Sequence, residues 1–166
     1  MRMMLTGAGA VGECILKMLE KRDPKGEWLS YVLLADFDLK RADEVKSHLE
    51  QERKYREGTQ YETAQVDARD REALTALMRE HRIDFVMDAA SPFVSNFIFD
   101  AAFEAGADYA SMGTWSVPKD HPEFGKGFEG AYLEPMTKYN FDRHEAWKEK
   151  GQMACICLGI DPGVVN

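Results

Sequence analysis

The chain begins MRMMLTGAGAVGECI (residues 1–15), and this stretch decides the fold. A short apolar run at residues 3–5 leads into Gly7-Ala8-Gly9-Ala10-Val11-Gly12, which has the spacing G-x-G-x-x-G. A pattern typical of an amphipathic helix follows at once. A strand, a glycine turn and a helix in this order indicate a dinucleotide-binding unit, because that context makes the glycine motif specific. The alternative is a glycine-rich turn in an α/β domain without a ligand.

Each glycine of the motif has its own expected role. Gly7 permits a tight turn, Gly9 lets the backbone approach a pyrophosphate, and Gly12 lets the helix pack closely on the strand. The free N–H groups at the start of the helix and its positive dipole end favour a diphosphate. The predicted cofactor-binding residues of this turn are therefore Gly7, Gly9, Ala10, Val11 and Gly12.

Length and composition restrict the class of protein. A chain of 166 residues predicts one main domain, and 45% hydrophobic with 30% charged residues is ordinary for a soluble globular protein. The net charge of −8 argues against nucleic acid or an anionic membrane surface as a partner. There is no apolar run of the ~20 residues that a membrane span needs. The N-terminus does not resemble a signal peptide, so we expect a cytoplasmic protein.

The three cysteines predict no metal or redox site, because their spacing fits no zinc pattern. Cys14 is expected on the apolar face of the first helix, together with Val11, Ile15, Met18 and Leu19. Cys155 and Cys157 are expected to point to one face of a buried strand, as small core residues of a reduced protein.

Apolar runs alternate with helical patterns along most of the chain. Strands are expected at residues 28–35, 61–66, 83–87, 107–111 and 153–158, with helices at 39–55, around 74–78, and at 93–105 and 141–150. This alternation predicts a Rossmann-type α/β fold, a doubly wound parallel sheet in three α/β/α layers. Residues 112–137 are rich in glycine, proline and aromatic residues, which is compatible either with a lid or subunit contact or with a surface loop.

Asp36 ends the second expected strand, twenty-four residues after Gly12. An acidic residue at this point hydrogen-bonds the adenosine ribose in dinucleotide folds, although an aspartate can also cap the following helix. A carboxylate here would repel the extra phosphate of NADP, so NAD is favoured. Lys40 and Arg41 leave NADP open, because a nearby basic side chain can accommodate a phosphate.

Further cofactor contacts are expected where later strands end. Asp67 follows the third strand and could contact the cofactor, with helix capping by Asp67 or Asp70 as an equal alternative. Ala89, Ala90 and Ser91 follow the fourth strand, and small residues beyond a carboxyl strand end admit a ligand.

Three segments together resemble the saccharopine dehydrogenase family, which includes saccharopine reductases, lysine dehydrogenases and carboxynorspermidine dehydrogenases. They are residues 7–12, Ala-Ala-Ser-Pro at 89–92, and Gly-Ile-Asp-Pro-Gly at 159–163. The resemblance implies that residues 1–159 are the NAD(P)-binding domain and that residues 160–166 begin a truncated second domain. That domain would bind substrate and form a homodimer. Family members that use NADP often have a basic residue just after the second strand, where this chain has Phe37.

The resemblance implies an NAD(P)-dependent oxidoreductase acting on a carbon–nitrogen bond of an amino acid, as a small-molecule substrate, or of its imine adduct. Catalytic residues are expected mainly in the second domain, with Asp161 as the local candidate for a substrate-side role. The alternative, which the sequence favours, is that Asp161 is a turn residue before Pro162. A regulatory domain that senses NAD(H) without catalysis is the alternative function.

Overall fold

The computed structural model describes residues 1–53, 58–114 and 136–158. In this part of the chain, six strands form one sheet in the order β3-β2-β1-β4-β5-β6, and every neighbouring pair is parallel. The strands are β1 (Arg2–Thr6), β2 (Tyr31–Asp36), β3 (Gln60–Gln65), β4 (Phe85–Asp88), β5 (Asp108–Ser111) and β6 (Ala154–Cys155). The order reverses between β1 and β4, which makes the crevice between them the expected ligand site. The predicted doubly wound fold is confirmed.

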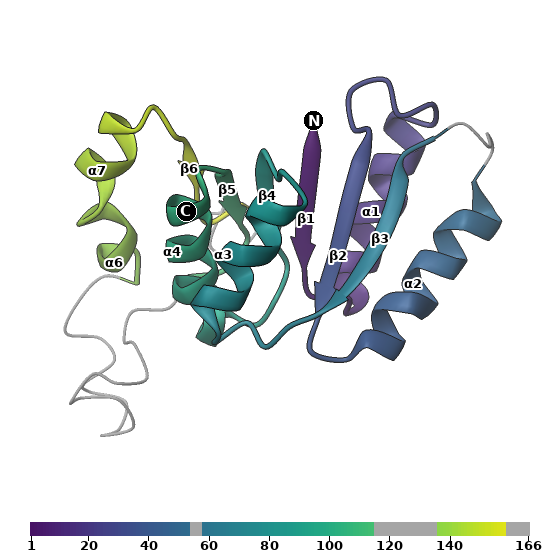
Figure 1. Ribbon diagram of the computed structural model, residues 1–166, viewed down its shortest axis with the longest axis horizontal. Helices are drawn as coiled ribbons and strands as arrows, with labels where there is room; N and C mark the ends of the chain where they lie inside the picture. Colours follow the sequence, from purple (N-terminus) through teal and green to yellow (C-terminus); the bar gives the residue numbers. More distant parts are fainter. Residues whose placement is uncertain (54–57, 115–135, 159–166) are drawn as a thin grey trace.

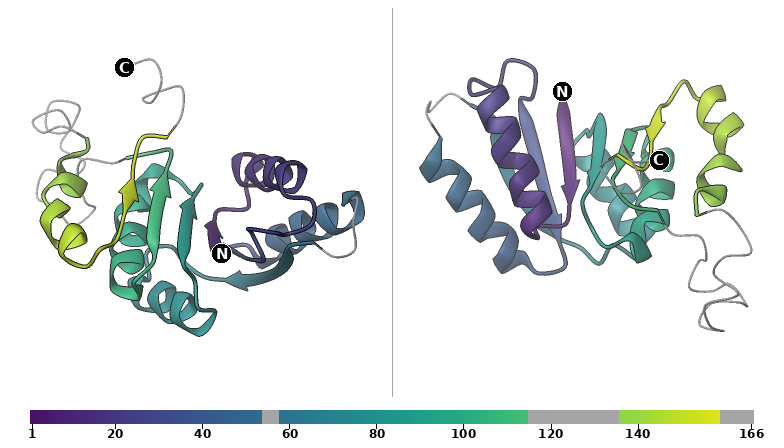
Figure 2. Two further views of the ribbon diagram at one scale, coloured as in Figure 1. Left: turned by 90° about the horizontal axis from the view of Figure 1, so that it is seen from above. Right: turned by 180° about the vertical axis from the view of Figure 1, so that it is seen from behind.

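Helices cover both faces of the sheet (Figures 1 and 2). Helices α1 (Ala10–Arg22) and α2 (Leu39–Glu52) lie on one face, and α3 (Arg71–Glu80) and α4 (Ser95–Ala105) lie on the other. A 3-10 turn, Pro92–Val94, precedes α4. The short helices α6 (Lys138–Phe141) and α7 (His144–Glu149) lie beside β6, with Trp147 packed on Phe99 at 4.7 Å between ring centroids.

The core has two halves, one on each face of the sheet. Met3 and Leu5 of β1 pack with the α1–α2 side, whereas Met4 between them packs with the α3–α4 side. Successive strand residues point to opposite faces, so a strand covered on both faces must be apolar throughout. This explains the continuous apolar run of β2, in which residues 31–35 are all buried.

Aspartates set several of the connections. Asp38 caps α2 by accepting the Arg41 N–H, and Asp70 caps α3 by accepting the Ala73 N–H. Asp23, which is buried, ends α1 and accepts the backbone N–H groups of residues 27, 28 and 29 at 2.8–3.0 Å. These bonds fix the loop that leads into β2.

The predicted buried face of α1 is wrong at Val11, Cys14 and Met18, whereas Ile15 and Leu19 are partly buried and pack against the core as expected. The buried residues of α1 are Gly12 and Leu16, whereas Val11 and Met18 are each 46% exposed and Cys14 is exposed. The close approach at Gly12 sets the rotation of the helix, so Gly12 and Leu16 face the sheet, while Val11, Cys14 and Met18 point outward.

The predicted burial of the last two cysteines is also wrong. Cys155 is exposed and Cys157 is half-buried with a φ of 59°. Strand β6 has only two residues and lies at the edge of the sheet, so nothing in the described residues covers one of its sides.

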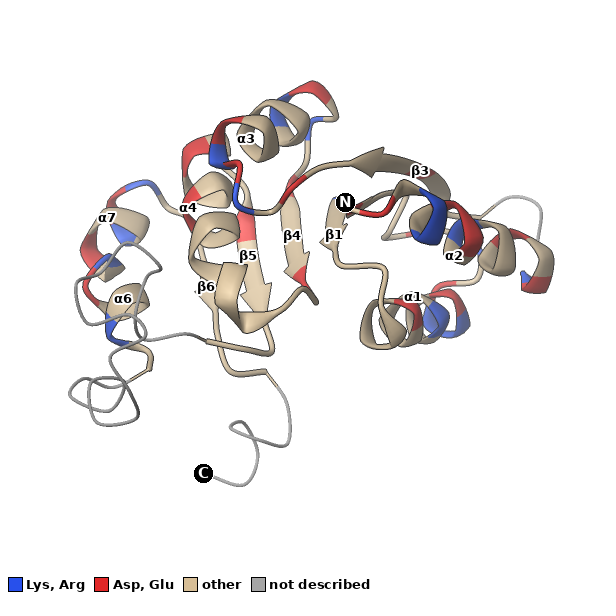
Figure 3. Cartoon of the chain, turned by 90° about the horizontal axis from the view of Figure 1, so that it is seen from below, with Lys and Arg blue, Asp and Glu red and all other residues tan. Residues whose placement is uncertain are grey.

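Several sequence-based expectations lie outside the described residues. They are the role of Asp161, the boundary at residues 159–160 and most of the loop at 112–137. In the described ranges no helix is long and apolar enough to cross a membrane. Charged residues of both signs lie mainly on the helices, while the strands are mostly uncharged (Figure 3).

Candidate dinucleotide-binding site

Two of the glycines pack where no side chain fits. Gly7 has a φ of 94°, and a Cβ there would lie 2.8 Å from the Ala89 carbonyl oxygen. A Cβ on Gly12 would lie 2.0 Å from the Gly7 carbonyl oxygen and 3.0 Å from Leu5 Cδ2. Gly7 therefore brings the ends of β1 and β4 together, and Gly12 brings α1 onto the turn.

Gly9 differs from the other two, because a Cβ built on it meets nothing within 4 Å. It is the N-cap residue of α1 and supplies no side-chain hydrogen bond to the helix. The N–H groups of the first turn of a helix have no partner within the helix, so they remain available to an anion that approaches Gly9.

A cavity of about 720 Å³ opens at the carboxyl ends of β1, β2, β3 and β4. Seven predicted site residues from four separate segments line it: Gly7, Gly9, Asp36, Asp67, Ala89, Ala90 and Ser91. Ala10, Val11 and Gly12 are not among its lining residues. Ala10 and Val11 are exposed at the start of α1, and Gly12 is buried beneath the turn. Their contact with a cofactor stays a prediction.

Asp36 is held at the tip of β2 by two backbone groups. Asp36 Oδ2 accepts the Ala8 N–H at 2.6 Å, and Oδ1 accepts the Asp38 N–H at 2.9 Å. Since Asp38 caps α2, the alternative that Asp36 caps this helix is wrong. The carboxylate instead joins the glycine turn to the end of β2 at the wall of the cavity.

Asp67 also lines the cavity and does not cap α3, which begins after Asp70. Its carboxylate binds the Arg69 guanidinium through both oxygens, at 2.5 Å for the Oδ2–Nη2 pair. Side-chain hydrogen bonding to Asp67 raises the pKa of Arg69. The end of β3 therefore presents an ion pair to the cavity rather than a lone acid.

Asp88 is buried at the end of β4 and holds the loop that follows this strand. The sequence did not predict this role. The Asp88 side chain is 2% exposed and accepts hydrogen bonds from the Tyr109 hydroxyl at 2.8 Å, the Ala90 N–H at 3.0 Å and the Thr6 hydroxyl at 3.1 Å. Burial raises the pKa of Asp88, while these hydrogen bonds oppose the change. An acid that directly follows a buried strand and precedes small residues was the available signal.

Aromatic residues of the cavity were also missed. Phe37 is 76% exposed and Phe93 is 59% exposed, and both line the cavity together with Phe97. Such exposed rings offer flat apolar surface to a ligand base. Phe37 directly follows Asp36, and this adjacency was the signal that could have placed it at the cavity.

Comparison with known proteins decides the family. The sequence matches the family described as "Saccharopine dehydrogenase NADP binding domain" over residues 3–155. The chain belongs to this family. The resemblance noted in the sequence is confirmed. The family places the chain among domains that bind a nicotinamide dinucleotide in saccharopine dehydrogenase-like oxidoreductases.

Two relatives are similar over nearly the whole chain. Carboxyaminopropylagmatine dehydrogenase of Synechocystis sp. is 24% identical over 165 residues, which are 99% of this chain and 36% of the relative. Carboxynorspermidine synthase of Vibrio alginolyticus is 26% identical over 168 residues, covering 100% of this chain and 38% of that protein. The chain thus spans between 36% and 38% of the length of these relatives.

A solved structure supports the fold. Saccharopine dehydrogenase (L-Glu forming) from Saccharomyces cerevisiae superposes with a TM-score of 0.64 at 15% identity. The similarity covers 99% of this chain and 28% of the yeast protein. Both have the α/β architecture predicted here.

Proposed function

We propose that this chain is the cofactor-binding part of an oxidoreductase that acts on a carbon–nitrogen bond of an amino acid or of its imine adduct. The family supports a nicotinamide cofactor, and both relatives are named for carboxylated amines, carboxyaminopropylagmatine and carboxynorspermidine. Forming or cleaving such an amine by oxidation or reduction is the chemistry that these names suggest. The substrate-binding and proton-transfer groups would lie outside the described residues.

We further propose that NAD is preferred to NADP. The observation that carries this preference is the Asp36 carboxylate, held by the Ala8 and Asp38 N–H groups at the cavity wall. A carboxylate at this position accepts hydrogen bonds from the two ribose hydroxyls of NAD and repels the 2′-phosphate of NADP. Phe37, which follows it, supplies no positive charge.

The residues of this chain would bind and orient the cofactor. The N–H groups at the start of α1 and the open surface at Gly9 would hold the pyrophosphate. Asp36 would hold the adenosine ribose, and the small residues Ala89 and Ala90 would leave room for the cofactor along the crevice. When bound, the cofactor supplies hydride transfer, and the protein supplies position and electrostatics.

Calorimetric titration with NAD and NADP tests this function. We expect NAD to bind more tightly than NADP, and Asp36→Ser to weaken NAD binding and reduce the difference. Asp38→Ser is the matched control, because Asp38 caps α2 and does not line the cavity. Equal affinities in the unmodified chain would contradict the preference for NAD. Binding of neither dinucleotide would contradict the function itself.

Substrate oxidation requires a separate assay on the full-length protein. We expect NADH formation from a carboxylated amine or an amino acid, or NADH consumption when an amine and a 2-oxo acid are mixed. A full-length protein that binds NAD but shows no turnover across these classes would favour the NAD(H)-sensing alternative.

A further inference from the structure

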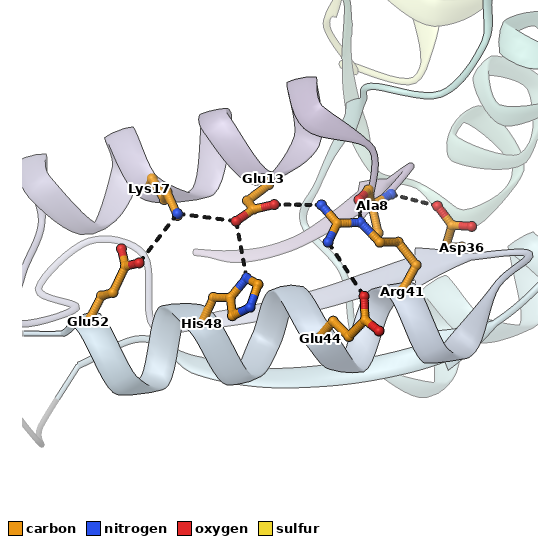
Figure 4. Close-up of polar contacts among 8 residues, drawn as sticks. All are labelled: Ala8, Glu13, Lys17, Asp36, Arg41, Glu44, His48 and Glu52. Atoms are coloured by element: carbon orange, nitrogen blue, oxygen red, sulfur yellow. Dashed lines mark hydrogen bonds and ion pairs between the residues drawn. The ribbon is translucent and has the colours of Figure 1, made fainter.

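Arg41 lies beside the same residue of the glycine turn that Asp36 holds. Arg41 Nε donates to the Ala8 carbonyl oxygen at 3.0 Å, while the Ala8 N–H donates to Asp36 Oδ2 at 2.6 Å (Figure 4). Arg41 of α2 and Asp36, the expected ribose-binding residue, therefore both bond to the backbone of Ala8. A free guanidinium there would suit a 2′-phosphate, because it binds phosphate oxygens through paired donors.

Glu13 engages this guanidinium from the first turn of α1. Arg41 Nη2 lies 2.5 Å from Glu13 Oε2, and the Glu13 side chain is only 17% exposed. Glu44 lies farther from the guanidinium, at 3.7 Å from Nη1. Arg41 is not among the described residues that line the cavity. Its charge is thus paired beside the cavity rather than presented to it.

The carboxylate of Glu13 is itself held from two further sides. Lys17 Nζ lies 3.1 Å and His48 Nδ1 lies 3.3 Å from Glu13 Oε1 (Figure 4). Hydrogen bonds from Arg41 and then Lys17 lower the pKa of Glu13 to about 2, so Glu13 is charged at neutral pH. A phosphate that attracted Arg41 would therefore have to break an ion pair whose acid is fixed between two helices.

We propose that Glu13 is a positioning residue for cofactor selectivity: it holds Arg41 against the glycine turn and thereby keeps it from binding the 2′-phosphate of NADP. The inference rests on the proposed dinucleotide binding and adds a second element to the repulsion by Asp36. Exclusion of NADP then depends on the Asp36 carboxylate near the ribose and on the pairing of Arg41 with Glu13. Removal of the Glu13 charge would release a cation next to the phosphate position.

Dissociation constants for NAD and NADP, measured by calorimetry on single and double variants, test the proposal. In Glu13→Gln we expect the ratio of the NADP dissociation constant to the NAD dissociation constant to fall about tenfold, the size of one charge-assisted hydrogen bond at a partly buried site. Glutamine retains an oxygen for Lys17, and thermal unfolding checks that the variant is folded. Arg41→Met alone should leave the ratio within about twofold of the unmodified chain, because Arg41 is already paired.

The double variant distinguishes release of Arg41 from direct repulsion of the phosphate by Glu13. In the Arg41→Met background, Glu13→Gln should no longer change the ratio. Glu52→Gln is the control, since Glu52 pairs with Lys17 at 3.5 Å and does not contact Arg41. An unchanged ratio in Glu13→Gln overturns the proposal, and so does an equal fall with and without Arg41, which would indicate direct repulsion by Glu13. A chain that binds neither dinucleotide would instead refute the proposed function on which the inference rests.

Discussion

Replacing Gly12 with alanine is expected to destabilise the domain, although alanine normally favours a helix. The added Cβ would lie 2.0 Å from the Gly7 carbonyl oxygen, and the next contacts are Leu5 Cδ2 at 3.0 Å and the Gly7 carbonyl carbon at 3.2 Å. Two of these three atoms are backbone atoms of a turn that is tied to β2 by the Gly7 N–H bond to Ala35. The turn therefore cannot yield as a flexible side chain would, and α1 must move away.

The size of the effect follows from two opposing terms. Alanine in place of glycine stabilises a helix interior by about 1 kcal/mol. Forcing an extra carbon into a packed backbone contact costs about 3 to 4 kcal/mol here, which is above the usual cost of overpacking because the atoms it meets are backbone atoms. The net loss in the free energy of unfolding is about 2 to 3 kcal/mol. For a chain of this length, this corresponds to a fall in Tm of roughly 4 to 12 °C.

Gly9→Ala is the matched comparison for this measurement. Its Cβ meets nothing within 4 Å, so we expect a loss below about 1 kcal/mol, as for an N-cap glycine replaced by alanine. Dinucleotide binding should nevertheless weaken, because the methyl group lies where a pyrophosphate would approach. Thermal unfolding by circular dichroism and calorimetric titration measure the two effects. A Gly12→Ala variant as stable as the unmodified chain would refute the packing argument, and unchanged NAD affinity in Gly9→Ala would refute the placement of the pyrophosphate.

Three further outcomes are expected. Asp88→Ala should lower the free energy of unfolding, measured by urea denaturation, by about 3 kcal/mol, because the buried Tyr109 hydroxyl loses its acceptor. Asp88→Asn keeps an acceptor oxygen and should lower the free energy of unfolding by less. Asp23→Ala should lower the free energy of unfolding by about 3 kcal/mol in the same assay, since three backbone N–H groups lose their acceptor. An unchanged urea midpoint would show that water replaces the carboxylate. The folded-state pKa of Glu13 is about 2, below its ordinary value of 4.5, so its contribution to stability is complete above about pH 4.5 and lost as the pH falls towards 2. Glu13→Gln should therefore flatten the acid side of the stability profile, and an identical profile would contradict the ion pairs of Glu13.

The glycine turn and the strand ends could be predicted because their signals are local. The spacing of Gly7, Gly9 and Gly12 and the position of Asp36 after an apolar run depend on neighbours in the sequence. The structure brings Gly7, Gly9 and Asp36 to one cavity, as expected. Asp88 was missed because two of its hydrogen-bond partners come from β1 and β5. A pattern of neighbouring residues in the sequence cannot predict a hydrogen bond between different strands.

The same limit explains the errors at α1 and β6. The apolar residues of α1 follow a helical period, yet periodicity cannot say which part of a broad apolar face lies against the sheet. Close contact at Gly12 decides this and leaves Val11, Cys14 and Met18 facing outward. Cys155 is exposed because β6 is the edge strand, which follows from the sheet order and not from its own apolar composition.

The sequence by itself determined the type of fold, the family and the turn at which a dinucleotide is expected, because strand–turn–helix chemistry is encoded in consecutive residues. Only the tertiary structure decided that Asp36 bonds to Ala8, and that Glu13 of α1 pairs with Arg41 of α2. These residues are 28 positions apart in each pair. The interactions arise when parallel strands bring α1 and α2 together on one face of the sheet, and the proposed selectivity for NAD rests on such contacts.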